Sequence, residues 1–279
     1  MNSTQTTTPP QPPVPTTLRV VCGIDASHAD EAAVREACEL AGAQGQVALL
    51  CVISASGAGL TAQATIEPSR ASEALERAMK QARGAGVPAS VYLLRSAHAA
   101  DAMLRAGADG DVLVVGTHGT SRAGGIALGS VMTTALHRAS VPVLVARRRP
   151  EGAHPSILFA SDGCPPSDRA CDYAASLAAR SGATVTLFTA DDANEPETRQ
   201  TLSRQTAALR EATGVEPTVV TTGAGKPADA IVEAATAVDA TLVVVGSRGC
   251  SGLRALGSVS EQVAHRAPCS VLVVRPPAG

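Results

Sequence analysis

The stretch from Asp111 to Val145, DVLVVGTHGTSRAGGIALGSVMTTALHRASVPVLV, decides the fold of this chain. It opens with an apolar, β-branched run at residues 112–115, which is typical of a buried strand. A glycine-rich segment and then a helical pattern follow, and the stretch closes on a second apolar run at residues 143–145. The predicted order is therefore strand, glycine-rich loop, helix and strand.

Four residues of this loop, Gly116, Gly119, Gly129 and Ser130, indicate a phosphate-binding site. The first backbone N–H groups of a helix have no partner within the helix, and the helix dipole favours an anion at that end. Glycine lets the backbone approach a ligand closely and adopt a positive φ. Ser130 is predicted to be the N-cap of the helix, with a hydroxyl that can donate to a phosphate oxygen. The loop lacks the Lys-Ser/Thr pair of a Walker A sequence, and its glycine spacing does not match the dinucleotide fingerprint.

The same unit occurs a second time, in residues 239–274. The residues that correspond to the four above are Gly246, Gly249, Gly257 and Ser258. The offset between the copies is 130 residues before the loop (246 − 116) and 128 after it (257 − 129), so the second loop is two residues shorter. A repeat of this length is a whole domain.

With these two loops, the chain beyond residue 17 resembles a tandem universal stress protein. Nucleotide-binding members of that family share a loop of Gly, two residues, Gly, nine residues, and Gly followed by Ser or Thr. The first copy has this spacing, whereas the second has seven residues in place of nine. The resemblance implies that the ligand is an adenine nucleotide, with ATP as the expected one, with or without Mg²⁺. We expect weaker binding in the second half.

Asp25 and Asp162 each stand just past the first strand of their half, and the resemblance implies that they contact the adenosine part of the nucleotide. The alternative is that each aspartate caps the helix that follows it, which needs no ligand. Arg122 lies inside the first loop, where an arginine fork suits phosphate oxygens. Ligands of doubly wound sheets bind outside the carboxyl ends of the strands, at the point where the strand order reverses. This rule places Asp25 beside the Gly116 loop and Asp162 beside the Gly246 loop.

Strands alternate with helices in both halves, which predicts parallel sheets wound by right-handed crossovers. We expect an α/β fold of two tandem doubly wound domains, Rossmann-like and similar to adenine nucleotide alpha hydrolases, each with a five-stranded parallel sheet. The expected organisation is a disordered tail at 1–17, one domain at 18–147, a linker at 148–155 and a second domain at 156–279.

The composition argues against several classes of function. With two Phe, two Tyr and no Trp, the chain has no aromatic platform for single-stranded nucleic acid, and a net charge of −2 gives no basic surface. The sequence has neither a signal peptide nor an apolar run approaching the ~20 residues of a membrane span. The seven cysteines are scattered without CxxC spacing, which is typical of reduced thiols in a cytoplasmic protein.

Catalytic and metal-binding signatures are missing from the sequence. There is no Gly-x-Ser-x-Gly elbow and no His, Cys and carboxylate cluster with metal spacing. His137 and His265, near the ends of the last helices, are interpreted as helix C-terminal cations. We expect a stress-related sensor or regulator that binds nucleotide. The alternatives are an interaction module of the same fold without nucleotide, and an enzyme with at most slow ATP hydrolysis.

Strand five of each half, at residues 143–145 and 270–274, should lie at a sheet edge and needs a cover. The resemblance suggests a cover, because single-domain universal stress proteins commonly pair through this strand. We therefore expect strand five to pack against strand five within this chain about a pseudo-two-fold axis, with Leu144 and Leu272 as equivalent central residues. A homodimer is the other assembly left open.

Overall fold

A computed structural model of the chain describes residues 14–27, 30–54, 66–117, 129–164, 166–190, 195–222, 225–247 and 256–276. The elements of the first half are β1 (Arg19–Ile24), α1 (Asp30–Ala41), β2 (Gln46–Ser54), α2 (Pro68–Gly84), β3 (Ala89–Ser96), α3 (Ala99–Ala108), β4 (Val112–Gly116), α4 (Ser130–Arg138) and β5 (Val143–Ala146). Those of the second half are β6 (Ser156–Ala160), α5 (Pro166–Ser181), β7 (Thr184–Thr189), α6 (Pro196–Thr213), β8 (Thr218–Thr221), α7 (Pro227–Ala237), β9 (Leu242–Gly246), α8 (Ser258–Arg266) and β10 (Ser270–Val274). This alternation confirms the predicted α/β class.

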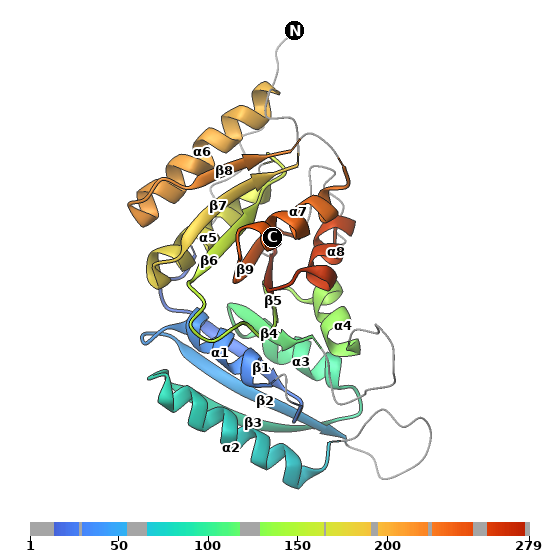
Figure 1. Ribbon diagram of the computed structural model, residues 1–279. Coiled ribbons are helices and arrows are strands. Elements are labelled where there is room, and N and C mark those ends of the chain that lie inside the picture. The colour runs from blue at the N-terminus through green and yellow to red at the C-terminus, as the bar shows by residue number, and fades with distance from the viewer. Residues whose placement is uncertain are drawn as a thin grey trace, which may run out of the picture.

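The strands of the described residues form one ten-stranded sheet, in the order β3-β2-β1-β4-β5-β10-β9-β6-β7-β8 (Figure 1). Neighbouring strands within each half run parallel, as predicted. The order is symmetric about the centre, where β5 corresponds to β10, β4 to β9 and β1 to β6. The two halves are therefore related by a pseudo-two-fold axis.

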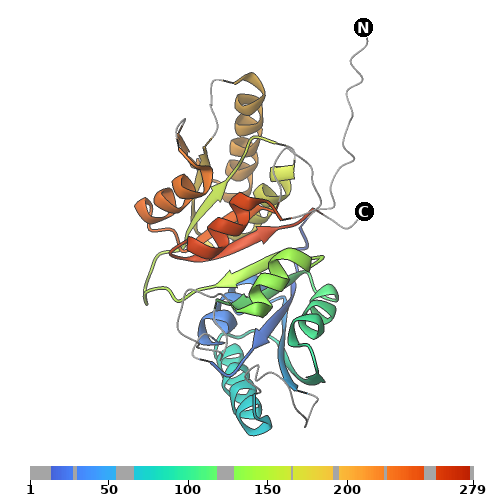
Figure 2. The same cartoon turned by 90° about the vertical axis from the view of Figure 1, so that its right-hand side faces the viewer.

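The centre of the sheet is the antiparallel pair of β5 and β10, which lie side by side in Figure 2. Leu144 is directly opposite Leu272, and a valine pairs with a valine on either side. Both leucine side chains are fully buried. This register confirms the predicted pairing of strand five with strand five. Pairing within one chain covers two apolar strand edges that would otherwise be open to other chains.

An arginine directly after each central strand crosses to the other half. Arg147 follows β5 and donates to the carbonyl oxygens of Ala264, at 2.5 Å, and Cys269, at 3.1 Å, around the end of α8. Arg275 follows β10 and donates to the carbonyl oxygen of Leu136 in the last turn of α4. Carbonyl groups at a helix C-terminus lack intrahelical donors and attract cations. Each half therefore holds the last helix of the other.

Helices cover both faces of the sheet and build two apolar cores. One core lies under α1, α2, α5 and α6 and includes Phe159 and Leu144, and the other lies under α3, α4, α7 and α8 and includes Leu113 and Leu136. Each core extends through both halves, so the central strand pair is part of the interior. Among the described helices, none combines the length and the apolar character needed to cross a bilayer.

The cysteines agree with the sequence analysis except at one position. Five are buried free thiols, namely Cys22, Cys38, Cys51, Cys171 and Cys269. Cys164 differs from the expectation of reduced thiols, because it is disulfide-bonded. The seventh cysteine, Cys250, lies outside the described residues.

Candidate functional site

The carboxyl edge of the sheet between β1 and β4 brings the candidate residues of the first half together. Cys22 pairs with Val114, and the same parallel register continued by two residues places Ile24 beside Gly116. Asp25, which directly follows β1, therefore lies next to the end of β4, as expected. The strand order reverses here, because β2 and β3 lie on one side of β1 while β4 and β5 lie on the other. Open α/β sheets bind ligands at such positions.

The second half repeats this arrangement between β6 and β9. Ala160, the last residue of β6, pairs with Val245. Asp162 lies in the turn that follows Ala160, and Gly246, the last residue of β9, follows Val245. The two candidate sites therefore occupy equivalent positions in the two halves.

Both aspartates close a tight turn. The Oδ1 atom of Asp25 accepts the backbone N–H of Ser27 at 2.9 Å, and that of Asp162 accepts the N–H of Cys164 at 3.2 Å. The following helices begin four or five residues after the aspartates, at positions 30 and 166. The capping alternative is therefore wrong for both aspartates, because an N-cap stands directly before the first helical residue.

The residue after each aspartate has a left-handed backbone conformation, with a φ of +59° at Ala26 and +72° at Gly163. Glycine adopts this conformation readily, whereas a residue with a Cβ is strained by about 1–2 kcal/mol. The turn of the first half therefore carries backbone strain next to Asp25 that the second half avoids. Strain of this kind often occurs at functional sites.

A second carboxyl group, that of Asp30 at the start of α1, lies close to Asp25 in the turn. Its Oδ1 atom accepts the backbone N–H of Asp25 at 2.9 Å, while its Oδ2 atom is shielded from solvent and has no hydrogen-bond partner among the described residues. Burial is the largest cause that raises the pKa of Asp30 to about 7. The backbone N–H of Asp25 lowers this pKa, and the Asp25 carboxyl group raises it. Sequence reasoning missed Asp30, because a five-residue spacing does not reveal that the turn brings two carboxyl groups together.

The second half has Ser167 at the position equivalent to Asp30. Its buried hydroxyl lies 3.0 Å from the Ser161 hydroxyl, donates to the Cys164 carbonyl oxygen at 2.7 Å and accepts from the Gln205 amide at 2.9 Å. Hydroxyl and amide groups therefore replace the carboxyl pair of the first half, and the Gln205 amide also donates to the Asp168 carboxyl group at 2.9 Å.

The two ends of each glycine-rich loop are joined by the same backbone hydrogen bond. Gly129 N–H donates to the Thr117 carbonyl oxygen at 3.4 Å, and Gly257 N–H donates to that of Ser247 at 2.8 Å. The two loops therefore differ in length by two residues, but both are closed by the same backbone hydrogen bond between their ends.

The helices that follow the loops begin without a side-chain cap. Gly129 is the N-cap of α4 and Gly257 that of α8, and neither helix has a side-chain cap hydrogen bond. Ser130 and Ser258 are the first helical residues and are exposed. The prediction of Ser130 as the N-cap was wrong, because the helical pattern alone does not fix where a helix begins to within one residue. Side chains of the described residues therefore leave the first-turn N–H groups available.

Three predicted site residues, Gly119, Arg122 and Gly249, lie outside the described residues. In the part of the chain that the structure describes, no group of three or more His, Cys, Asp or Glu side chains is arranged to hold a metal ion.

The two histidines of the last helices differ from each other. His137 Nε2 lies 3.0 Å from Glu261 Oε1 of the other half, so this pair bridges α4 and α8. Burial lowers the pKa of His265; Glu261 opposes the shift, and Arg147 adds to it. His265 lies in the last turn of α8, where burial disfavours its charged form and Arg147 supplies a positive charge.

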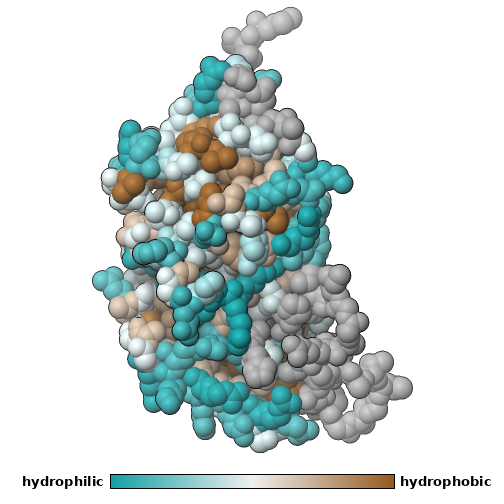
Figure 3. All heavy atoms as spheres, in the orientation of Figure 1, coloured by the Kyte–Doolittle hydropathy of each residue, from teal (hydrophilic) through white to brown (hydrophobic). Residues whose placement is uncertain are grey.

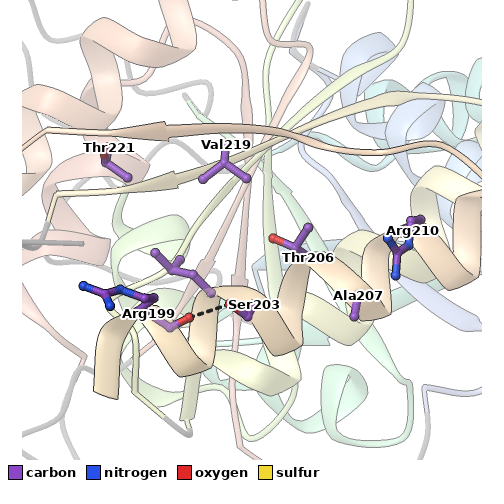
Figure 4. A pocket seen from close by; sticks show the side chains of 8 residues that line it. Arg199, Ser203, Thr206, Ala207, Arg210, Val219 and Thr221 are labelled. Atoms are coloured by element: carbon purple, nitrogen blue, oxygen red, sulfur yellow. Dashed lines mark hydrogen bonds between the residues drawn. The ribbon is translucent and has the colours of Figure 1, made fainter. Parts of the chain in front are cut away.

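A separate groove of about 350 Å³ lies between α6 and β8, near one end of the sheet (Figure 4). Leu202 and Val219 supply apolar lining, and Arg199 and Arg210 stand toward its two ends. Figure 3 shows apolar side chains gathered over β8, where Val219 is 46% exposed. Because β7 and β6 separate β8 from β9, this groove is distinct from the switch point.

Known proteins resemble this chain along most of its length. The model of the Universal stress protein family matches residues 17–147 and again 155–275. A universal stress protein of Mycolicibacterium smegmatis is 29% identical over 289 residues, which cover 92% of this chain and 97% of that protein. A crystal structure of a universal stress protein from Archaeoglobus fulgidus has a TM-score of 0.68 at 22% identity, covering 95% of this chain and 98% of that one. A universal stress protein solved in complex with cAMP is 34% identical and covers 44% of this chain and 98% of its own, with a TM-score of 0.38.

Proposed function

This chain belongs to the universal stress protein family. We propose that it binds adenine nucleotide at the carboxyl edge of its sheet, with ATP as the expected ligand. In this proposal the first half carries the stronger site, because its loop has the spacing of nucleotide-binding members. The protein acts as a stress-related sensor or regulator, and nucleotide occupancy sets which partner it contacts.

The start of α4 at the switch point is the observation that carries the proposal. Gly129 stands at the N-cap without a side chain, so a phosphate oxygen can approach the first-turn N–H groups. The positive end of the helix dipole adds to this attraction. Ser130 is exposed at the first helical position, where its hydroxyl can donate to the same phosphate.

Asp25 supplies an acceptor for the nucleoside part. Its turn is fixed by the bond from Ser27 N–H to Oδ1, and it lies beside the end of β4. A carboxylate accepts hydrogen bonds from hydroxyl and amino groups, and a nucleoside offers both. Asp162 has the same role in the second site of this proposal.

The contacts between the halves suggest how occupancy is communicated. The N-terminus of α4 would hold phosphate, and the C-terminal turn of the same helix is bound by Arg275 of the other half. In the opposite direction, Arg147 binds the end of α8. A shift of either helix on nucleotide binding would therefore change its contact with the arginine of the other half.

Two measurements on the full chain test the proposal, the first on protein as purified and the second after bound nucleotide has been removed. Mass spectrometry of the ligand released from freshly purified protein should identify an adenine nucleotide. In calorimetric titrations with ATP, Gly129→Val with Ser130→Ala should abolish binding in the first half, because a β-branched side chain blocks the backbone approach. Gly257→Val with Ser258→Ala is the matched control, and it should spare the first site. Unchanged ATP affinity of the first variant, with the second site also disabled, would overturn the assignment.

A further inference from the structure

We propose that Asp30 is a positioning residue for Asp25 and makes nucleotide binding in the first half sensitive to pH, whereas binding in the second half lacks this sensitivity. This inference rests on the proposed function of the site.

The geometry places the two carboxyl groups in one hydrogen-bonded turn. Asp30 Oδ1 accepts the N–H of Asp25 at 2.9 Å, and Asp25 Oδ1 accepts the N–H of Ser27 at 2.9 Å. Each bond fixes the backbone that carries Asp25, so the orientation of the Asp25 carboxylate depends on Asp30. The second oxygen of Asp30 is buried without a partner, which makes a negative charge on it costly.

The backbone N–H groups of Asp25 and Ala26 favour the charged form of Asp30, but burial outweighs them. Among the described residues, Asp25 in the turn is the ionisable group that acts on Asp30, and Asp30 in turn acts on the thiols of Cys22 on β1 and Cys51 on β2. Burial raises the pKa of the Cys22 thiol well above its usual value and that of Cys51 to about 12, so both thiols are neutral. The pKa of Asp30, at about 7, therefore reflects a partly buried carboxyl group whose closest ionisable neighbour is another acid.

The protonation state of Asp30 then decides what Asp25 presents to a ligand. Below pH 7 Asp30 is protonated, so it adds no negative charge beside Asp25. Above pH 7 Asp30 carries a negative charge, and the repulsion between this charge and the Asp25 carboxyl group opposes the position that Asp25 has in the turn. The additional negative charge also opposes the phosphates of an incoming nucleotide. Affinity in the first half should therefore fall as the pH rises through 7.

The second half provides the internal comparison. Ser167 occupies the position of Asp30, and its hydroxyl is held by Ser161, Cys164 and Gln205. Since this hydroxyl does not ionise, the position equivalent to Asp30 adds no charge to the turn that carries Asp162 at either pH 6 or pH 8.

The experiment uses the full chain with the second site disabled by Gly257→Val and Ser258→Ala. ATP and adenosine, which carries no phosphate, are titrated at pH 6 and pH 8, and proton uptake is measured from heats in two buffers of different ionisation enthalpy. In this background the affinity for both ligands should be at least about fivefold weaker at pH 8, with proton uptake on binding near pH 7. Asp30→Asn should remove the pH dependence of adenosine binding and the associated proton uptake. Glu31→Gln, a change at the next residue of α1, is the matched control and should keep both, because the Glu31 side chain is 74% exposed.

Each outcome decides the inference. If adenosine affinity depends on pH in the same way with and without Asp30→Asn, the inference is overturned and the proposed function stays intact. Absence of binding in every chain at both pH values would overturn both. Asp30→Ser, which copies the residue of the second half, repeats the test if Asp30→Asn does not fold. An NMR titration of the Asp30 carboxyl carbon in the ligand-free chain gives an independent check, and a midpoint near 4 would also overturn the inference.

Discussion

Replacing Leu144 and Leu272 by aspartate is expected to open the central strand pair while each half stays folded. The two side chains are fully buried and directly opposite each other in the antiparallel register. Their Cβ atoms are expected to be about 5 Å apart, as in cross-strand pairs generally. The substitution therefore places two like charges in contact inside an apolar core.

The magnitude follows from the burial. Removing a buried leucine side chain costs about 2–5 kcal/mol, and burying a carboxylate without a partner adds several kcal/mol for each site. The pair of changes therefore costs roughly 10 kcal/mol, which is comparable to the whole stability of a domain at about 5–15 kcal/mol. Separation of β5 from β10 lets both carboxylates reach water. The five strands of each half keep their four parallel pairings with one another.

Small-angle scattering and limited trypsin digestion report this opening. The radius of gyration should rise, and cleavage should increase in the linker at 148–155, where Arg149 is paired with Glu39 in the intact protein. Far-UV circular dichroism should retain the helical signal. Leu144→Met with Leu272→Met is the control, because it keeps volume and apolar character and should leave both measurements unchanged. Wild-type compactness together with an uncut linker in the aspartate variant would refute the strand-five interface.

Three further predictions concern the two sites. With one site disabled at a time in the full chain, the first half should bind ATP more tightly than the second by calorimetry, and tighter binding by the second half would show this ranking to be wrong. Ala26→Gly should raise the free energy of unfolding by about 1 kcal/mol in denaturant titrations, because it relieves a positive φ that Gly163 adopts in the second half, and a loss of stability would contradict the strain argument. Asp30→Asn should become more stable relative to wild type as the pH rises from about 4 to about 7. Over this window the folded wild type keeps a proton that the unfolded chain has lost, so its stability falls by roughly 2 kcal/mol after allowance for solvent screening. A constant stability difference across this window would show that the pKa of Asp30 is not raised.

The fold was largely predictable, because its signals are local or repeated. The alternation of apolar runs with helical patterns gave the strands and helices, and the repeat of the loop unit gave two equivalent halves. The pairing of Leu144 with Leu272 followed from the need to cover an apolar edge, with the family resemblance supplying the partner strand. The crossing contacts of Arg147 and Arg275 were not predictable, because they depend on where the end of one helix meets the other half in space.

The candidate site was predictable only in part. The position of Asp25 beside Gly116 follows from the rule that parallel strands end at one edge, so sequence reasoning could locate it. The role of Asp30 could not be found in the same way, because its effect comes from a turn geometry and from burial. The one-residue error at Ser130 has a related origin, since glycine and serine both suit the N-cap position.

A crystal structure of the full chain grown with ATP would show where the nucleotide binds. We expect density for the nucleotide at the carboxyl edge between β1 and β4, with the phosphates at the first turn of α4 next to Gly129 and the nucleoside within hydrogen-bond reach of Asp25. Nucleotide bound in the groove between α6 and β8, or an empty carboxyl edge in both halves at saturating ATP, would contradict it.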